Sequence, residues 1–144
     1  MSSIPRFKRI APATLTVTVG TPTGGIADIQ HWQDGNQLAI AEAAATPGIT
    51  ATLAFSGVTS ILRLFVMGYY VGTHYVVIEF WNYTDSAWDV FDTIEVGSES
   101  QVYDIPVFDD TDYISSGAAQ IRLNHPSAGD NTHDLYIDYV ALLY

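Results

Sequence analysis

Residues 63 to 88 set the architecture of this chain, and they read RLFVMGYYVGTHYVVIEFWNYTDSAW. Two runs, 61–70 and 74–82, are dense in Val, Ile, Phe, Tyr and Trp, the residue types that favour strands. In the second run both sets of alternating positions are largely apolar, which indicates a strand inside a two-layer structure. We expect the two runs to form the central hairpin of an all-β domain, with Val71-Gly72-Thr73 as the turn.

Strand-like segments recur along the rest of the chain, between turns rich in Gly, Pro, Asn and Asp. They are 14–19, 26–32, 37–43, 49–55, 90–96, 101–108, 118–125 and 133–144. No amphipathic helix of useful length appears. Eight or nine short strands predict an antiparallel β-sandwich of the jelly-roll type. With 144 residues the chain fits one such domain, which we place at 14–144 after an extended N-terminal arm at 1–13.

The expected arm, MSSIPRFKRIAPA, differs from the rest of the chain in charge. It holds three of the five basic residues, and no acidic residue precedes Asp28. The body that follows is strongly acidic, and the net charge of the whole chain is −11. The arm also carries apolar residues, which a solvated tail would not need. We therefore expect it to dock on its own body or on a neighbouring subunit through Ile4, Arg6, Phe7, Lys8, Arg9 and Ile10.

Composition excludes several classes of function. An acidic body would repel nucleic acid, because affinity there depends on neutralising phosphates with Lys and Arg. No apolar run approaches the ~20 residues of a membrane span, so no membrane partner is expected. The chain has no cysteine, which excludes disulfides, thiolate nucleophiles and zinc–thiolate sites.

The four histidines, His31, His74, His125 and His133, stand at none of the spacings typical of a metal site. We expect ordinary histidines in loops or at strand ends, and hence no metal. His133 precedes Asp134, as in part of a catalytic triad, but no nucleophile lies in a G-x-S-x-G turn.

The acidic residues offer two further hypotheses. A glycosidase needs two carboxylates that face each other across a cleft, at a separation that the sequence does not give. Glu79 and Asp138 are the only carboxylates inside strongly apolar runs. We expect no catalysis from them and predict that the chain is not an enzyme. Asp109, Asp110 and Asp112 could bind calcium, but the segment lacks the glycine and final glutamate of an EF-hand loop, so a solvated turn is favoured.

Aromatic residues could form a platform on which sugar rings stack. The candidates are Trp32, Trp81, Trp88, Tyr69, Tyr70, Tyr75 and Tyr83. Trp81 has apolar neighbours and is expected in the core. Trp32 and Trp88 lie near turns, so these two are the carbohydrate-binding candidates.

Five segments, DGNQLAIAEA, ATLAFSGVTSILRLFVMGYY, HYVVIEFWNYTDSAWDVFDTI, DDTDYIS and HDLYIDYVALLY, resemble the jelly-roll modules of tailed-phage virion proteins. Those modules are similar to carbohydrate-binding and galactose-binding-like domains, and the resemblance covers about residues 14–144. It implies either capsid decoration or glycan binding. Carbohydrate-binding relatives often hold a structural calcium between an early and the last strand, where Glu42 and Asp138 stand here, but we expect no metal and no cofactor.

The chain opens with Met1 and ends on its last expected strand, which favours a stand-alone protein. We predict a non-enzymatic virion protein, a cement or decoration protein that stabilises the phage head after assembly in the host cytoplasm. Its partners would be the major capsid protein and copies of itself, as the homotrimer that the resemblance implies. The alternative is a carbohydrate-binding module of a phage tail fibre, spike or head fibre, with a host surface glycan on Trp32 and Trp88.

Overall fold

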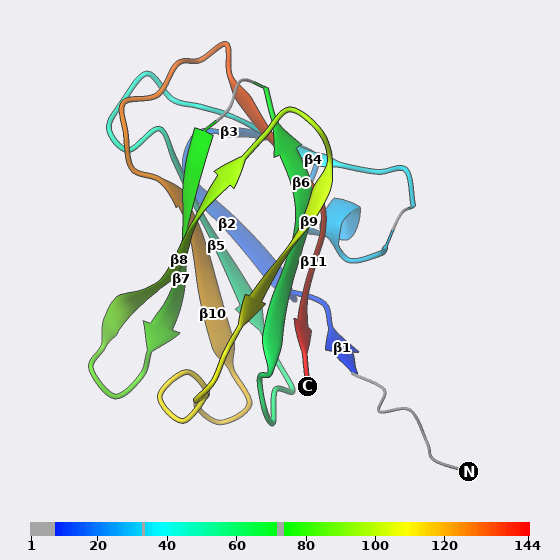
Figure 1. The fold of residues 1–144 in the computed structure, drawn as a ribbon, viewed down its shortest axis with the longest axis vertical. Helices are drawn as coiled ribbons and strands as arrows, with labels where there is room; N and C mark the ends of the chain where they lie inside the picture. Colours follow the sequence, from blue (N-terminus) through cyan, green and yellow to red (C-terminus); the bar gives the residue numbers. More distant parts are fainter. Residues whose placement is uncertain (1–7, 33, 72–73) are drawn as a thin grey trace.

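The computed structural model describes residues 8–32, 34–71 and 74–144, and they form a sandwich of two antiparallel sheets (Figure 1). The sheet around β11, called the β11 sheet, has the order β3 (Thr21–Thr23), β4 (Leu38–Ala41), β11 (Asp134–Leu143), β6 (Arg63–Tyr70) and β9 (Gln101–Pro106), and β1 (Arg9–Ile10) also pairs with β11. The sheet around β10, called the β10 sheet, has the order β2 (Thr14–Val19), β5 (Ile49–Phe55), β10 (Ala119–His125), β7 (His74–Asn82) and β8 (Ala87–Val96). The predicted all-β sandwich is confirmed.

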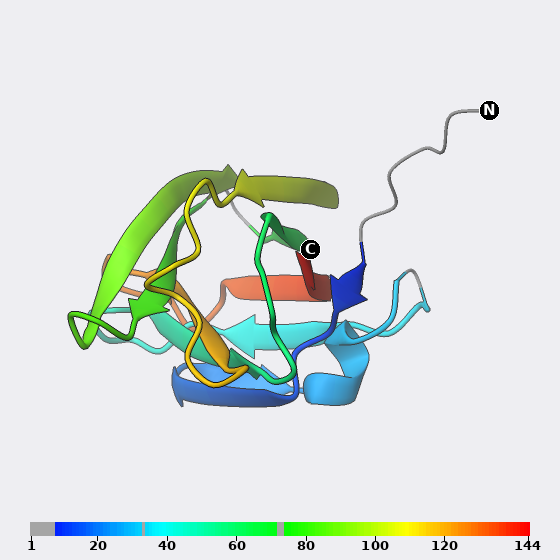
Figure 2. The ribbon, with the colours of Figure 1, turned by 90° about the horizontal axis from the view of Figure 1, so that it is seen from below.

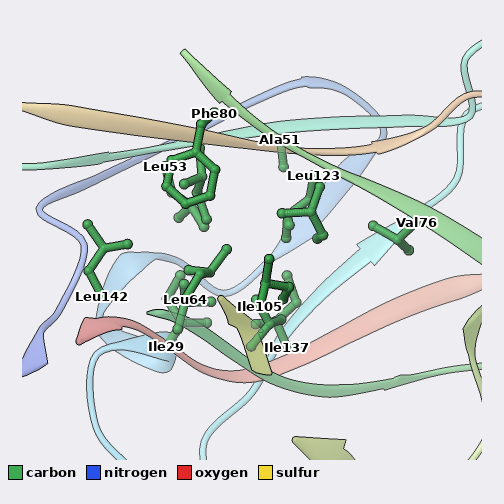
Figure 3. Packing of buried hydrophobic residues seen from close by; sticks show 14 of the residues in the cluster. Ile29, Ala51, Leu53, Leu64, Val76, Phe80, Ile105, Leu123, Ile137 and Leu142 are labelled. Carbon is green, nitrogen blue, oxygen red and sulfur yellow. The ribbon is translucent and has the colours of Figure 1, made fainter. Parts of the chain in front are cut away.

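The core lies between the two sheets and follows from period-2 alternation along the strands. In β5 and β10 every second residue is buried, so Leu53 and Leu123 point inward while their neighbours point out. Figure 3 shows these side chains facing Leu64 and Ile137 of the β11 sheet. Each fully buried side chain of this kind contributes about 1.5–3 kcal/mol relative to an exposed one, so the two sheets hold each other together.

The predicted central hairpin is wrong in its pairing. β6 lies in the β11 sheet between β11 and β9, whereas β7 lies in the β10 sheet between β10 and β8. The two runs are strands, but the chain crosses from one layer to the other between them. Both strands bury alternate side chains in the same core, and they can do so from opposite sides because they belong to different sheets. The hairpin partner of β7 is instead β8, through the turn at 83–86.

Residues 26–32 and 37–43 do not form two strands around a turn, as expected. The first segment contains a short 3-10 helix, η1 (Ile26–Ile29), and only the second contains a strand, β4. Gly25 N donates a 2.7 Å hydrogen bond to Asp28 Oδ2, which stabilises the first turn of η1. Ile29 is fully buried against the core. Ile26 and Ile29 are three residues apart, and a 3-10 helix with three residues per turn places both on one face. The same spacing also fits an irregular strand.

Part of the expected arm belongs to a sheet. Arg9 and Ile10 pair with Leu143 and Leu142, and Lys8 N donates to the carbonyl of Tyr144 at 2.8 Å. Figure 2 shows β1 beside the C-terminal end of β11. Of the expected docking residues, Ile4, Arg6 and Phe7 lie outside the described residues. No helix in the described part of the chain is long and apolar enough to cross a membrane.

Candidate functional site

Two tryptophans stand side by side on the outer face of the β10 sheet. In β7 the side chains of Ile78 and Phe80 point into the core, so Glu79 and Trp81 point outward. Trp88 of β8 is the direct antiparallel partner of Trp81, and their ring centroids are 5.3 Å apart at an interplanar angle of 68°. Both rings are partly exposed. This corrects the expectation that Trp81 lies in the core: the strand alternates, and its core side is filled by Phe80.

Arg122 of β10 fixes the position of this tryptophan pair. Its Nε and Nη2 donate to Glu79 Oε2 and Oε1 at 2.6 and 2.9 Å. The guanidinium also lies over the ring of Trp88, 4.6 Å from the ring centroid. Glu79 is only 7% exposed, so a partly buried bidentate ion pair and a cation–π contact hold three strands in one arrangement.

The Arg122–Glu79 ion pair keeps donors and acceptors that could bind a ligand. Arg122 carries five N–H donors and uses two of them on Glu79, and each Glu79 oxygen accepts one of these bonds. Polar side chains continue along the same face, where the Thr50 hydroxyl donates to Asn124 Oδ1 at 3.1 Å. The face, called the Trp81–Trp88 face, thus combines aromatic planes with rigid donors and acceptors. Such a surface fits a flat ligand with apolar faces and hydroxyl edges.

Trp32 lies on the other side of the molecule. It contacts Tyr139 on the outer face of the β11 sheet, with centroids 5.3 Å apart, and Arg9 lies 5.8 Å above its ring. Tyr69 and Tyr136 stack on the same face at 4.6 Å. Trp32 and Trp88 thus lie on opposite outer faces of the sandwich, and the structure does not bring them together. Carbohydrate binding at either residue stays a prediction.

A groove of about 470 Å³ opens where the edge strands β8 and β9 face each other. Phe91 and Tyr113 form part of its wall, together with the carboxylate-bearing residues Asp92 and Asp109. Phe108 stands at this groove with 96% of its surface exposed. The groove is a concave surface bordered by β8, the strand that also carries Trp88.

The aspartates of the 109–112 loop accept hydrogen bonds from inside the loop and from neighbouring segments. Asp109 Oδ1 accepts bonds from the backbone and hydroxyl of Thr111, and these bonds hold the pKa of Asp109 below its usual value. Asp110 Oδ2 accepts from the backbone N–H of Ile61 at 2.8 Å. Asp112 Oδ1 accepts from the hydroxyl of Thr84 at 2.7 Å. Asp109 thus stabilises its own turn, whereas Asp110 and Asp112 join the loop to the segment before β6 and to the turn between β7 and β8.

Glu42 and Asp138 do not form the calcium pair that the resemblance implies. In the register of β4 and β11, Ala41 pairs with Asp134 and Leu38 with Ile137. Glu42 and Asp138 therefore lie beyond opposite ends of this ladder. Asp138 is nearly buried, and its pKa is raised by that burial and, to a lesser degree, by the negative charge of Asp34.

Three histidines that are far apart in the sequence surround Glu42. His74 begins β7, His125 ends β10, and His133 directly precedes β11. Sequence spacing did not reveal this cluster, because its members come from separate strands. The one available signal is their position at strand ends, since antiparallel pairing brings the end of β10 beside the start of β7. His31 lies apart from the cluster and is exposed.

No family model matches this sequence, and no curated protein matches it. Solved structures do match the fold. A family 29 carbohydrate-binding module has a TM-score of 0.62 and 14% identity, over 96% of this chain and 90% of its own. A family 29 variant in complex with mannohexaose has a TM-score of 0.59, 13% identity and coverage of 96% and 93%. A family 36 module in complex with calcium and xylotriose has a TM-score of 0.54, 13% identity and coverage of 95% and 99%. The chain has the β-sandwich fold of carbohydrate-binding modules.

Proposed function

We propose that this protein is a non-catalytic carbohydrate-binding module that binds an oligosaccharide chain on the Trp81–Trp88 face. The observation that carries the proposal is the Arg122–Glu79 ion pair beside two partly exposed tryptophans. The indole rings would stack on the apolar faces of sugar rings, and the remaining donors and acceptors of the ion pair would bond hydroxyl groups. Because the ion pair already fixes these groups, little side-chain entropy is lost on binding.

The similar structures support this reading at the level of chemistry. The family 29 module occurs in complex with mannohexaose, and the family 36 module with xylotriose. Variants of the family 29 module that replace an Asp, a Tyr or an Arg were made to probe ligand recognition. Aromatic, acidic and arginine side chains are the types that the Trp81–Trp88 face presents here.

Capsid decoration, expected from the phage resemblance, gains less support. The structural neighbours described above are carbohydrate-binding modules. Of the expected docking arm, the described residues Lys8, Arg9 and Ile10 pair with β11 of the same chain. A virion location, a capsid partner and a trimer stay predictions from the sequence alone, and glycan binding is the better-supported function.

The test is affinity electrophoresis through gels that contain glucomannan, xylan or cellulose derivatives. The wild-type protein is expected to be retarded by at least one polysaccharide. A Trp81→Ala/Trp88→Ala double variant is expected to lose this retardation, since it removes both aromatic planes on which the apolar faces of sugar rings would stack.

Trp32→Ala is the matched control, because it removes the remaining tryptophan from the opposite face. It is expected to be retarded as the wild type is. Circular dichroism establishes that each variant is folded. If Trp32→Ala loses retardation and the double variant keeps it, the binding face is on the β11 sheet and the proposed site is wrong.

A further inference from the structure

A nearly buried carboxylate and three imidazoles meet at one end of the sandwich, away from the Trp81–Trp88 face. Glu42 is 2% exposed, and its Oε1 lies 3.2 Å from His125 Nε2 and 3.9 Å from His74 Nε2. Its Oε2 lies 3.8 Å from His133 Nδ1. The ligand atoms of Glu42, His74 and His125 all lie within 4.8 Å of one another. Four nitrogen and oxygen donors thus converge from four separate segments.

The hydrogen bonds of His125 determine which of its ring nitrogens faces Glu42 with a lone pair. His125 Nδ1 lies 2.9 Å from the carbonyl oxygen of Tyr75, which can only accept, so Nδ1 carries the proton. In the neutral ring, Nε2 then presents a lone pair toward Glu42. Within the described residues, this buried nitrogen has no hydrogen-bond partner. A lone pair facing a carboxylate oxygen at 3.2 Å is repulsive unless a cation or a second proton lies between them.

The surroundings of Glu42 orient its carboxylate. The Tyr70 hydroxyl donates to Oε1 at 2.6 Å, and the backbone N–H of Asp130 donates to Oε2 at 2.6 Å. A carboxylate and an imidazole that are each held by a second group are typical of metal ligands, whose outer partners fix their orientation.

Two close loops hold this cluster in place. Gly48 N donates to the carbonyl of His125 at 3.0 Å, and Gly129 N donates to that of Ala45 at 2.8 Å. A Cβ on Gly48 would stand 2.8 Å from Gly129 Cα and 3.0 Å from the His125 ring, and one on Gly129 would collide with the carbonyl of Ala43. Only glycine allows the loops to approach this closely, because a side chain at either position would collide with the opposite loop. The close approach holds the metal-ligand atoms of the cluster together.

We propose that Glu42, His74, His125 and His133 bind one divalent transition-metal ion of the zinc class. Zinc with imidazole ligands has Zn–N distances of about 2.0–2.1 Å, which place tetrahedral donors roughly 3.3–3.4 Å apart. The Glu42–His125 distance of 3.2 Å already fits, and the distances of 3.8 and 3.9 Å require only small side-chain shifts. His74 Nε2 and His133 Nδ1 lie 2.7 Å apart and would have to separate.

The donor set selects the class of ion. Calcium and magnesium prefer oxygen ligands, whereas imidazole favours zinc, copper and nickel. Side chains of His74 and His133 are 24% and 33% exposed, which gives an ion access from solvent. The alternative is that a second proton on His125, and not a metal ion, lies between Nε2 and Glu42. The following experiment distinguishes the two.

In the experiment, zinc chloride is titrated into EDTA-dialysed protein, and calorimetry measures the binding. The wild type is expected to bind one zinc per chain, and its melting temperature is expected to rise with zinc concentration. His125→Gln and His133→Asn are expected to weaken zinc binding at least tenfold. Cobalt(II) bound to the wild type is expected to show the intense visible absorption of a tetrahedral site, which adventitious surface binding lacks.

His31→Asn is the matched control, because His31 is exposed and lies apart from the cluster. It is expected to bind zinc as the wild type does. His133 is the more exposed ligand, so His133→Asn decides the question if His125→Gln does not fold. The proposal is overturned if the wild type binds no zinc saturably, or if His31→Asn loses as much affinity as His133→Asn. If the wild type binds no zinc, a second proton on His125 Nε2 faces Glu42 instead of a metal ion.

Discussion

Arg122 and Glu79 are direct antiparallel partners on β10 and β7, and two hydrogen bonds of 2.6 and 2.9 Å join their side chains. The pair lies between the outward-facing residues of β5 and the Trp88 ring of β8, in the middle of the outer face of its sheet. A bidentate pair there fixes the positions of polar groups that would otherwise sample many rotamers. This rigidity is the physical basis of the proposed glycan-binding face.

Arg122→Lys is expected to weaken glycan binding about tenfold or more. Lysine keeps the charge but has no planar fork, so the bidentate bond to Glu79 and the stacking on Trp88 are both lost. Hydrogen bonds to charged groups contribute about 1.5–3 kcal/mol each, which sets this magnitude. Isothermal titration calorimetry with a hexasaccharide measures the change. Arg63→Lys is the control, because the exposed Arg63–Asp104 pair lies on the other sheet, and equal losses in both variants would contradict the proposed site.

Asp138→Asn is expected to increase the free energy of unfolding at pH 7. Burial, with a smaller effect of Asp34, raises the pKa of Asp138 in the folded state. The folded protein therefore binds more protons than the unfolded one between the unfolded pKa, about 3.9, and the raised value, and stability falls as the pH rises through that window. The amide removes this cost.

Urea unfolding of the wild type and Asp138→Asn at pH 7 and near pH 3 measures the effect. The stabilisation is expected at pH 7 and is expected to vanish near pH 3, where the carboxyl group is protonated in both states. A gain that is equal at both pH values would show that titration of Asp138 is not its cause.

Phe80→Ala is expected to reduce the free energy of unfolding by about 3–5 kcal/mol. Phe80 is fully buried, and its ring lies 4.4 Å from Phe91 and 5.9 Å from Tyr113, measured between centroids. Phe108→Ala is the matched control, because Phe108 is 96% exposed, and its change is expected within about 0.5 kcal/mol. Chemical denaturation of both variants tests the assignment of the core, and similar losses would contradict it.

Deletion of residues 1–10 is expected to destabilise the protein relative to deletion of residues 1–7. The difference isolates residues 8–10, which contribute the Lys8–Tyr144 backbone bonds of 2.8 and 2.9 Å and the packing of Ile10 against the core. These contacts together predict a loss of about 1–3 kcal/mol. Thermal unfolding of the two truncated proteins measures it. Equal stabilities would mean that β1 adds nothing to the β11 sheet.

Strand positions could be predicted from the sequence wherever alternation was regular. Residues 14–19 and 49–55 are strands with the expected bounds, because each alternates between core and solvent. The sheet to which a strand belongs could not be predicted in this way. Alternation shows that one face of 63–70 and of 74–82 is buried, but a hairpin and a crossing between layers bury the same residues.

The candidate site was less predictable than the fold. Trp88 was selected because it follows a turn, and it does lie on an outer face. Trp81, Glu79 and Arg122 were not connected to it, because their proximity depends on the register of three strands. The histidine cluster was missed for the same reason. Such contacts join residues 32 (Glu42–His74) to 91 (Glu42–His133) positions apart, and they depend on tertiary pairing, which local spacing does not encode.

The most direct test of the central claim uses the indole N–H signals of the three tryptophans in a two-dimensional ¹⁵N NMR spectrum. Single Trp→Phe variants assign the three signals, and the protein is then titrated with a hexasaccharide derived from a polysaccharide that retards it in the gel. The account predicts that the signals of Trp81 and Trp88 shift in a saturable way while that of Trp32 does not move. A shift of the Trp32 signal alone would place the binding site on the opposite sheet and contradict the account.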